Sequence, residues 1–161
     1  MFERLTKDAR AAVLQARSEA RALGAHTLEA EHLLLGLAGQ PGTAAARLLA
    51  EAGLGCEDVR GALDRELTRS LEAVGVPAGA FGSLPAPVPM TGEPRWGTSA
   101  KVALSKALGI AQSRRDRRIE PAHILLAVLR ARGGTVPRAL AAADVDVAAL
   151  VARIEAALDA R

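Results

Sequence analysis

The chain has 161 residues, half of them hydrophobic, and only three are aromatic: Phe2, Phe81 and Trp96. This composition excludes a disordered chain and predicts an all-α fold, because an aliphatic core suits closely packed helices. The formal net charge of +3 comes from interleaved acidic and basic residues, so we expect no nucleic-acid partner. One cysteine, Cys56, excludes an internal disulfide. Without a leader or a long apolar run, we expect a cytoplasmic protein with no membrane segment.

The sequence predicts four helices in each half of the chain, from apolar residues that recur at spacings of three and four. In the first half these helices span 7–23, 29–37, 44–52 and 57–71, and in the second half 99–113, 121–129, 136–143 and 147–158. Side chains that can accept hydrogen bonds from the first turn cap four of them: Thr6, Thr43, Thr135 and Asp146. The last helix of the first half should bury Val59, Leu63 and Leu67.

The second half repeats the first. The stretch from Glu29 to Leu37 contains His32, and a similar stretch from Glu120 to Val128 contains His123, 91 positions later. At that shift, residues 5–67 align with 96–158 without a gap, and 14 of the 63 pairs are identical. A run of aliphatic residues follows each histidine, so each stretch should be the central helix of its half.

The halves are joined by a segment with a different composition. Residues 75–95 hold five of the eight prolines and four glycines, which predicts an extended linker. Within it, Phe81 and the run from Leu84 to Met90 are more apolar than a spacer needs. We therefore divide the chain into a first repeat, 1–74, a linker, 75–95, and a second repeat, 96–161, within one compact domain.

No pattern in the sequence predicts catalysis. Residues 92–99 resemble a phosphate-binding loop, but Thr98 stands where the lysine is needed and no strand precedes it. His32 and His123 have no cysteines or carboxylates at metal-ligand spacing around them, so we interpret them as buried structural residues. We expect no metal, no cofactor and no enzymatic activity. A hydrolase that uses either histidine has little support.

The start from Phe2 to Thr6, the alanine-rich first helix and the doubled central stretch with its histidine resemble the N-terminal domain of the Clp-type AAA+ unfoldases, closest to the ClpC branch. The resemblance implies a bundle of eight helices made of two four-helix repeats related by a pseudo-twofold axis. In that family the domain receives substrates and adaptors for ATPase rings that feed the ClpP protease. Because the 161 residues hold no phosphate-binding loop, we expect a freestanding module without those rings.

The resemblance also implies two candidate sites. ClpC-type domains bind phosphorylated arginine through a Thr at the start of the first helix and the Glu before the central His. Thr6 and Glu31 match this pair, whereas the second half has Gly97 and Ala122. A solvated first-turn carboxylate is the alternative interpretation of Glu31.

The second implied site is a groove between the halves, in which actinobacterial relatives bind apolar cyclic peptide antibiotics. Phe2, Trp96 and Lys101 match this groove, and Phe81 of the linker is a further aromatic candidate. Where the family has a carboxylate one turn further, this chain has Ser105. Ordinary core packing is the alternative interpretation of the aromatic residues.

Two functions of different classes stay open. The first is a freestanding binding module that captures peptides or peptide-like ligands and acts as an adaptor, a competitor or a decoy. As a decoy it would sequester a cyclic peptide antibiotic and so protect a full Clp unfoldase. The second is a structural accessory or adaptor that docks on a Clp protease assembly, with the unfoldase or ClpP as its partner. The apolar part of the linker could cover the groove as a lid.

Overall fold

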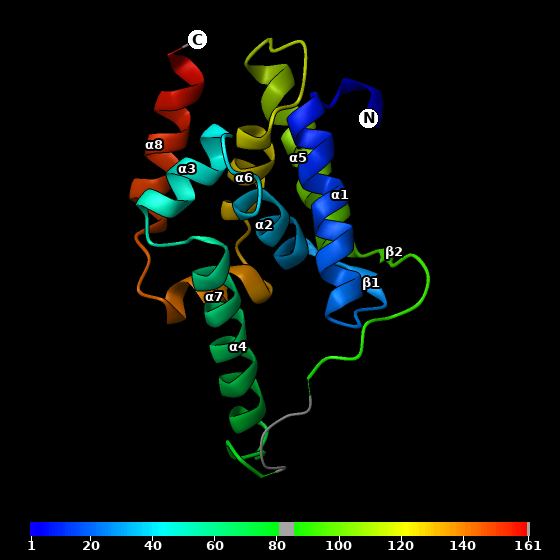
Figure 1. The fold of residues 1–161 in the computed structure, drawn as a ribbon. Helices are drawn as coiled ribbons and strands as arrows, with labels where there is room; N and C mark the ends of the chain where they lie inside the picture. Colours follow the sequence, from blue (N-terminus) through cyan, green and yellow to red (C-terminus); the bar gives the residue numbers. More distant parts are fainter. Residues whose placement is uncertain (81–85, 161) are drawn as a thin grey trace.

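A computed structural model describes residues 1–80 and 86–160. These residues form eight α-helices: α1 (Lys7–Ala22), α2 (Ala30–Ala38), α3 (Ala44–Glu51), α4 (Cys56–Ala73), α5 (Thr98–Ser113), α6 (Pro121–Leu129), α7 (Thr135–Ala142) and α8 (Val147–Asp159) (Figure 1). A short 3₁₀ helix, η1 (Phe2–Arg4), and two strands of two residues each, β1 (Thr27–Leu28) and β2 (Arg95–Trp96), complete the described structure. The predicted all-α fold with four helices in each half is confirmed.

Local capping explains where most helices begin. The side chains of Thr6, Thr43 and Asp146 accept hydrogen bonds from the first turns of α1, α3 and α8, as predicted. The prediction for Thr135 is wrong, because this residue is the first of α7 and follows Gly134. Gly134 has a φ of +103°, a conformation that glycine adopts readily.

The central helices α2 and α6 lie at the middle of the bundle and are covered on several sides. Helix α2 contacts α1, α3, α4, α5, α6 and α7, and α6 contacts α1, α2, α3, α5, α7 and α8. His32 and His123 are both buried, as predicted. Their Nδ1 atoms accept hydrogen bonds from the backbone N–H groups of Glu29 at 2.9 Å and Glu120 at 3.0 Å, so each histidine stabilises the start of a central helix.

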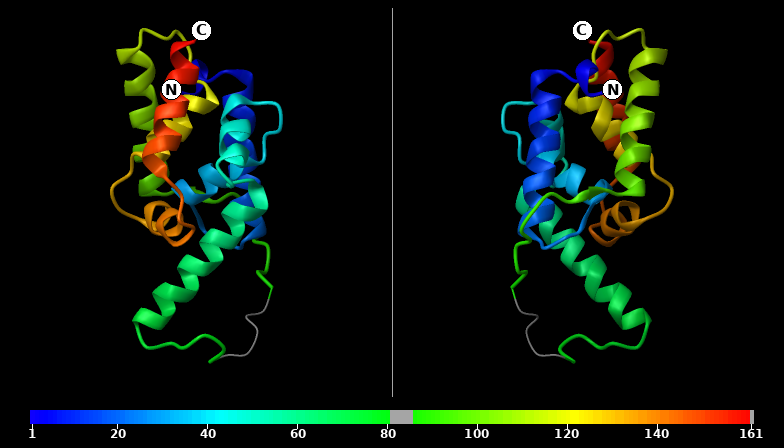
Figure 2. Two further views of the ribbon diagram at one scale, coloured as in Figure 1. Left: turned by 90° about the vertical axis from the view of Figure 1, so that its left-hand side faces the viewer. Right: turned by 90° about the vertical axis from the view of Figure 1, so that its right-hand side faces the viewer.

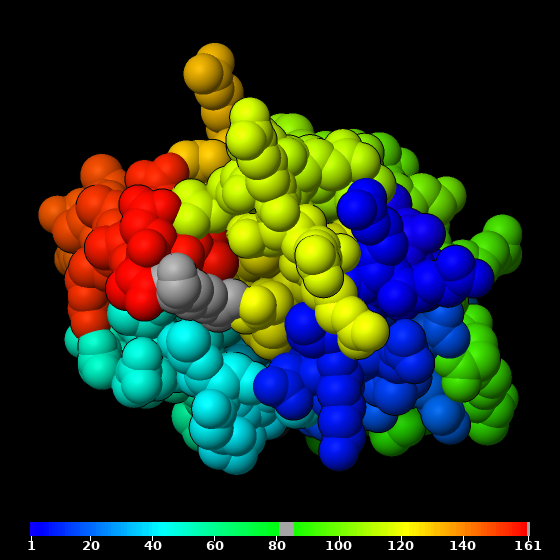
Figure 3. Space-filling view, turned by 90° about the horizontal axis from the view of Figure 1, so that it is seen from above, coloured from blue at the N-terminus to red at the C-terminus, as the bar shows by residue number. Residues whose placement is uncertain are grey.

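The two halves exchange their short extended segments. Strand β1 pairs with β2 in parallel, with Leu28 opposite Trp96, and an isolated bridge joins Leu5 to Ile119. The shift of 91 positions makes these two contacts equivalent. Thus the segment before the first helix of each half pairs with the segment before the central helix of the other half. In Figure 3 the N-terminal residues, in dark blue, accordingly lie against the segment that joins α5 to α6, in yellow.

The last helices are exchanged in the same way, since α4 packs on α7 and α3 packs on α8. The outer half of α4 projects beyond the body of the molecule (Figures 1 and 2). Val59 is buried and Leu63 half-buried, but Leu67 is 49% exposed, so its predicted burial is wrong. The apolar stripe of α4 faces the body of the molecule as predicted. Its outer end is exposed because α4 extends beyond α7, the helix on which it packs.

The described end of the linker lies against α1. The backbone N–H of Met90 donates to the carbonyl of Arg21 at 3.0 Å, and Glu93 forms ion pairs with Arg17 and Arg21. Phe81, the linker residue predicted to join the groove, lies outside the described residues. In the described ranges, no helix combines the length and the apolar character needed to cross a bilayer.

Candidate functional site

A pocket of about 260 Å³ lies at the junction of the two halves, and we call it the seam pocket. Its lining comes from the N-terminus, from β2 and from one face of α5: Met1, Phe2, Trp96, Lys101 and Leu104. Buried Leu104 forms an apolar floor, whereas Met1 and Phe2 are 46% and 47% exposed. Large apolar side chains that stay this exposed beside one another are available to a ligand.

Trp96 is held between an aromatic ring and a cation. The centroids of the Phe2 and Trp96 rings are 5.5 Å apart and the rings are tilted by 48°, a favourable arrangement for aromatic pairs. The guanidinium carbon of Arg17 lies 5.3 Å from the centre of the Trp96 ring, and Glu93 pairs with the same guanidinium at 3.2 Å. These contacts fix the orientation of the indole before any ligand arrives.

The structure brings together Phe2, Trp96 and Lys101, three of the four residues predicted for the groove. The described linker residues 86–94 do not line this pocket. Sequence reasoning missed Met1 and Leu104, which also line the pocket, and Arg17, which lies over the Trp96 ring. The position of Leu104, one helical turn after Lys101, places it on the same face and could have identified it.

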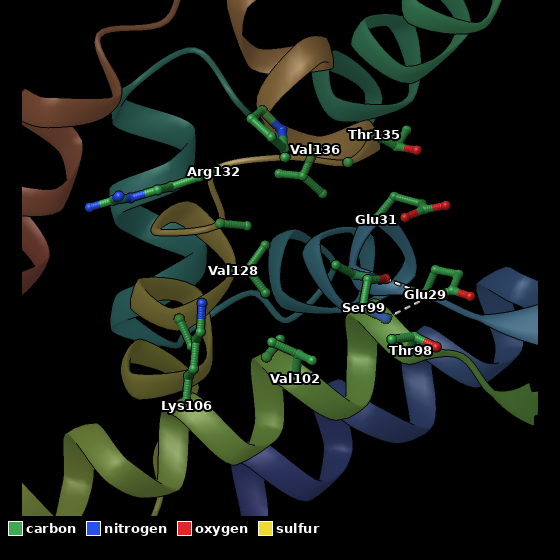
Figure 4. Close-up of a pocket in the computed structure, with 17 residues that line it drawn as sticks. Glu29, Glu31, Thr98, Ser99, Val102, Lys106, Val128, Arg132, Thr135 and Val136 are labelled. Atoms are coloured by element: carbon green, nitrogen blue, oxygen red, sulfur yellow. Dashed lines mark hydrogen bonds between the residues drawn. The ribbon is translucent and has the colours of Figure 1, made fainter.

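A second and larger pocket, of about 520 Å³, lies between α5, α6 and α7 and reaches the start of α2 (Figure 4). We call it the α5–α6 pocket. Its floor is apolar and includes Val102, Val128 and Val136. Glu29 and Glu31 lie on one side of this floor, and Lys106 and Arg132 lie on the opposite side. The pocket thus has an acidic end and a basic end.

The carboxylate of Glu29 already occupies the N-terminus of α5. Its Oε2 accepts hydrogen bonds from the backbone N–H of Ser99 at 3.0 Å and from the Ser99 hydroxyl at 2.5 Å. A Cβ on Gly97 would lie 2.0 Å from the Glu29 carboxylate, so the absence of a side chain at position 97 leaves room for it. Glu29 therefore fills the place where an external anion would meet this helix end.

The predicted pair Thr6 and Glu31 is not brought to one site. Thr6 caps α1 and its backbone N–H donates to the carbonyl of Ile119, just before α6. Glu31 instead faces the start of α5, because the segments before the helices are exchanged between the halves. Burial raises the pKa of the Glu31 carboxyl above its usual value, against the opposing effect of a hydrogen bond from its own backbone.

In the part of the chain that the structure describes, no group of three or more His, Cys, Asp and Glu side chains could hold a metal ion. His123 Nε2 bonds to the Asp116 carboxylate at 2.8 Å, so this ring has both nitrogens engaged. Burial lowers the pKa of His32, which favours its neutral form. Both histidines act in the fold, at the starts of the central helices.

Comparison with known proteins gives one family model, the Clp repeat (R) N-terminal domain, which matches residues 4–81 and 95–161. The chain is 32% identical over 146 residues to the chloroplastic chaperone protein ClpC1 of Oryza sativa subsp. japonica, and this alignment covers 91% of the chain. It is 30% identical over 154 residues to a ClpA homolog of Porphyra purpurea, described as an ATP-binding subunit of the ATP-dependent Clp protease. The chain spans 14% and 17% of the lengths of these two relatives.

Solved structures show the same fold. The N-terminal domain of ClpD from Arabidopsis thaliana superposes with a TM-score of 0.71 at 20% identity, and the match covers 98% of this chain and 99% of that domain. The N-terminal domain of Hsp104 from Candida albicans gives a TM-score of 0.62 at 23% identity, over 93% of this chain and 88% of the other. The bundle of paired repeats is therefore shared with these domains.

Proposed function

Because this chain belongs to the Clp repeat N-terminal domain family, we propose that it is a non-enzymatic binding module that captures peptide or peptide-like ligands in the seam pocket. One observation carries the proposal: the tilted rings of Phe2 and Trp96 pack against each other at the rim of an apolar pocket floored by Leu104. An aromatic pair of this kind gains most when a ligand removes it from water.

The charges around the seam pocket favour an apolar ligand with hydrogen-bond acceptors. Lys101 is exposed, and no ion pair of the described chain involves it. No carboxylate lines the pocket, and Ser105 stands where the family has one. In a compact, apolar cyclic peptide, backbone carbonyl groups that point outward can accept hydrogen bonds from the Lys101 ammonium group. An apolar cyclic peptide combines these properties.

The test is titration of the purified chain with an apolar cyclic peptide by calorimetry. Phe2→Ala and Trp96→Ala should each weaken binding by about tenfold or more, since each removes half of the aromatic pair. Lys7→Ala, which changes an exposed lysine of α1 outside the pocket, is the matched control and should bind like the parent. No binding by the parent, or binding by both aromatic variants as tight as that of the parent, would refute the proposal.

The decoy role follows from capture by mass action. A chain present at a concentration comparable to that of a cyclic peptide lowers the free peptide available to a full Clp unfoldase. Adding the chain to an unfoldase assay that the peptide perturbs should therefore restore the normal rate in proportion to the amount added. The Trp96→Ala variant should restore much less. Equal rescue by the parent chain and by Trp96→Ala would show that the decoy role does not depend on the seam pocket.

We do not propose a phosphoarginine site formed by Thr6 with Glu31, because these residues lie at different contacts between the halves. At the start of α5, Glu29 takes the position that a phosphate would need. If phosphoarginine binds near Glu31, Glu29 must first leave Ser99. This arrangement favours the seam pocket over a phosphoarginine site as the place of capture.

A second function, an accessory that docks on a Clp protease assembly, is favoured by the projecting end of α4. Leu67 and Val74 are 49% and 75% exposed there, and these apolar side chains offer a surface to a partner. Co-purification with purified ClpP or with a Clp unfoldase, and its loss in Leu67→Asp, would support docking through α4. Docking that persists in this variant, or none by the parent, would exclude the α4 surface.

A further inference from the structure

The turn after α1 and the turn after α5 are equivalent in the repeat, but they carry different charges. The shift of 91 positions places Arg115 at the position of Gly24. Both residues have a positive φ, +68° at Gly24 and +61° at Arg115. Glycine adopts this conformation readily, whereas a residue with a side chain adopts it at a cost. The backbone of the turn therefore does not explain the arginine at position 115.

Three further arginines lie close to Arg115 and come from two segments. Arg117 and Arg118 follow in the same turn, and Arg4 is the last residue of η1. The backbone N–H of Ile119 donates to the carbonyl of Arg4 at 2.8 Å, so η1 lies next to this turn, and Figure 3 shows the two segments side by side. All four arginines are exposed, and we call them the arginine face.

The arginine face has positive charge available to a partner. Among the described residues, no ion pair involves any of its four arginines. The carboxylate of Asp116, within the turn, lies 2.8 Å from His123 and 3.5 Å from Arg114. In residues 2–4 and 114–118, Glu3 is the one other carboxylate. Four guanidinium groups therefore outnumber the acidic groups beside them.

The dipole of α5 does not account for the whole cluster. Cations near the end of a helix are stabilised by its negative pole, but this effect falls off within the last turn. Arg114 is the C-cap of α5 and occupies that position. Arg117 and Arg118 lie beyond the cap, and Arg4 belongs to another segment. At least three of these exposed charges thus have no role in stabilising α5.

In the first half, an extended segment covers the equivalent turn. The linker crosses the end of α1, where the backbone N–H of Met90 donates to the carbonyl of Arg21 at 3.0 Å. A Cβ on Gly24 would lie 2.6 Å from the carbonyl oxygen of Val88. Glu93 of the same segment pairs with Arg21 at 3.7 Å. The chain thus already contains an extended acidic segment that is held on the end of a helix.

At the end of α5, a segment cannot follow the same path. The Cβ of Arg115 stands where the carbonyl of Val88 lies in the first half, because Arg115 replaces Gly24. A segment at this turn must therefore lie further out, at the level of the guanidinium groups. Recognition there depends on the charges of side chains rather than on the backbone of the turn.

We propose that the arginine face binds an acidic segment of a partner protein, in extended form and with several Asp or Glu side chains. Guanidinium groups form paired, charge-assisted hydrogen bonds with carboxylates. The face is confined to two short segments, whereas a nucleic-acid site uses a broader basic surface. The proposal goes beyond peptide capture in the seam pocket, because the arginine face shares no lining residue with that pocket.

The experiment titrates a hexapeptide of glutamate, blocked at both ends, into the isotopically labelled chain and follows backbone amide shifts by NMR. We expect the largest shifts at Leu5, Arg115 and Arg118. Binding should weaken about tenfold between roughly 50 and 200 mM salt, because exposed charges are screened. The matching hexapeptide of glutamine should not bind. No binding of the glutamate peptide, or equally tight binding of the glutamine peptide, would overturn the proposal.

Matched charge reversals locate the site. The double variant Arg117→Glu, Arg118→Glu should weaken binding of the glutamate peptide by about tenfold or more. The double variant Arg65→Glu, Arg69→Glu changes the net charge by the same amount at two exposed arginines of α4, and it should weaken binding less than about twofold. Equal losses in the two double variants would show attraction to the net charge alone and would overturn the arginine face.

Arg115→Gly separates binding from folding. Glycine fits the positive φ at this position, so the midpoint of chemical denaturation should not fall. The loss of one guanidinium should weaken binding of the glutamate peptide about threefold. A lower midpoint with unchanged affinity would assign Arg115 to the fold and would overturn its place in the arginine face.

Two further titrations test the identity of the partner and of the surface. A short thymidine oligonucleotide should bind more weakly than the glutamate peptide. Tighter binding of the oligonucleotide, lost in Arg117→Glu, Arg118→Glu, would assign the face to nucleic acid and overturn the protein partner. In Trp96→Ala the glutamate peptide should bind as it does to the parent, because Trp96 lines the seam pocket. Loss of binding in Trp96→Ala would assign the peptide to that pocket and overturn the proposal.

Discussion

Single residues decide how closely the helices of each half approach. Gly36 and Gly109 both lie within helices, but their surroundings differ: a Cβ at Gly36 would meet the backbone of α1, and a Cβ at Gly109 would meet nothing within 4 Å. A glycine can therefore be required by packing at one position and be merely tolerated at the other. The sequence alone does not separate the two cases, since each is a glycine in a helical pattern.

We predict that Gly36→Ala lowers the free energy of unfolding by about 1 to 3 kcal/mol, because α1 must move away from α2. Gly109→Ala should instead raise it by up to about 1 kcal/mol through better helix propensity. Chemical denaturation of the two variants and the parent measures both effects. A neutral Gly36→Ala would show that α1 moves away from α2 without loss of stability.

His32 makes stability depend on pH. Burial lowers its pKa in the folded chain, so the unfolded chain binds more protons as the pH falls past the usual value of 6.5. The stabilising contribution of neutral His32 is thus fully present above that pH and is lost as the pH falls toward the lowered pKa of the folded chain. Its Nδ1 also accepts the Glu29 N–H, an interaction that protonation removes.

We predict that the free energy of unfolding falls between pH 7.5 and pH 5.5, and that His32→Gln reduces this fall. Glutamine can still accept the Glu29 N–H from the same helical position, and it does not titrate. Denaturation curves at a series of pH values provide the measurement. An equally steep fall in His32→Gln would assign the pH dependence to other groups.

The contact between helices α4 and α7 depends on particular side chains of the two halves. Helix α4 is held on α7 by Glu66, a buried carboxylate that accepts from Arg138 Nε at 2.7 Å and from Ser70 Oγ at 2.6 Å. The Ser70 hydroxyl and the Arg138 guanidinium lower the pKa of Glu66. Its ionised form therefore stabilises the fold above the usual value of 4.5, and this contribution is lost as the pH falls below it.

We predict that Arg138→Ala costs about 1 to 3 kcal/mol at neutral pH, because the buried Glu66 loses a charged partner. The matched control is Arg47→Ala, at the equivalent position of the first half, where the ion pair with Glu51 is exposed and 3.9 Å long. Its loss should cost less than about 1 kcal/mol. Equal costs for the two variants, measured by denaturation, would show that the α4–α7 contact does not depend on Glu66.

Across the whole molecule, the properties that the sequence predicts well are local ones. Helix positions follow from the spacing of apolar residues, and three caps follow from side chains next to the helix start. The burial of His32 and His123 follows from the aliphatic run beside each. Leu67 shows the limit, since a helical stripe indicates which face turns inward but not how far the partner extends.

The sites depend on arrangements that the repeat alone cannot reveal. The alignment shows that Thr6 and Gly97 are equivalent, but it does not show that Gly97 meets Glu29 of the other half. The grouping of Phe2 with Trp96 came from the resemblance to a family. The α5–α6 pocket was not predicted, because its residues come from the starts of α2, α5 and α7 and from the end of α6, far apart in the sequence.

The paired contacts of Leu5 with Ile119 and of Leu28 with Trp96 have the geometry of an isologous dimer in which each subunit completes the other. In this chain the linker supplies by tethering what separate subunits would need by concentration, an effective concentration that reaches the millimolar range for short flexible linkers. Identical subunits would carry every substitution twice. The fused chain can change one copy alone, as at position 127, where alanine stands at the place that glycine holds in the first half.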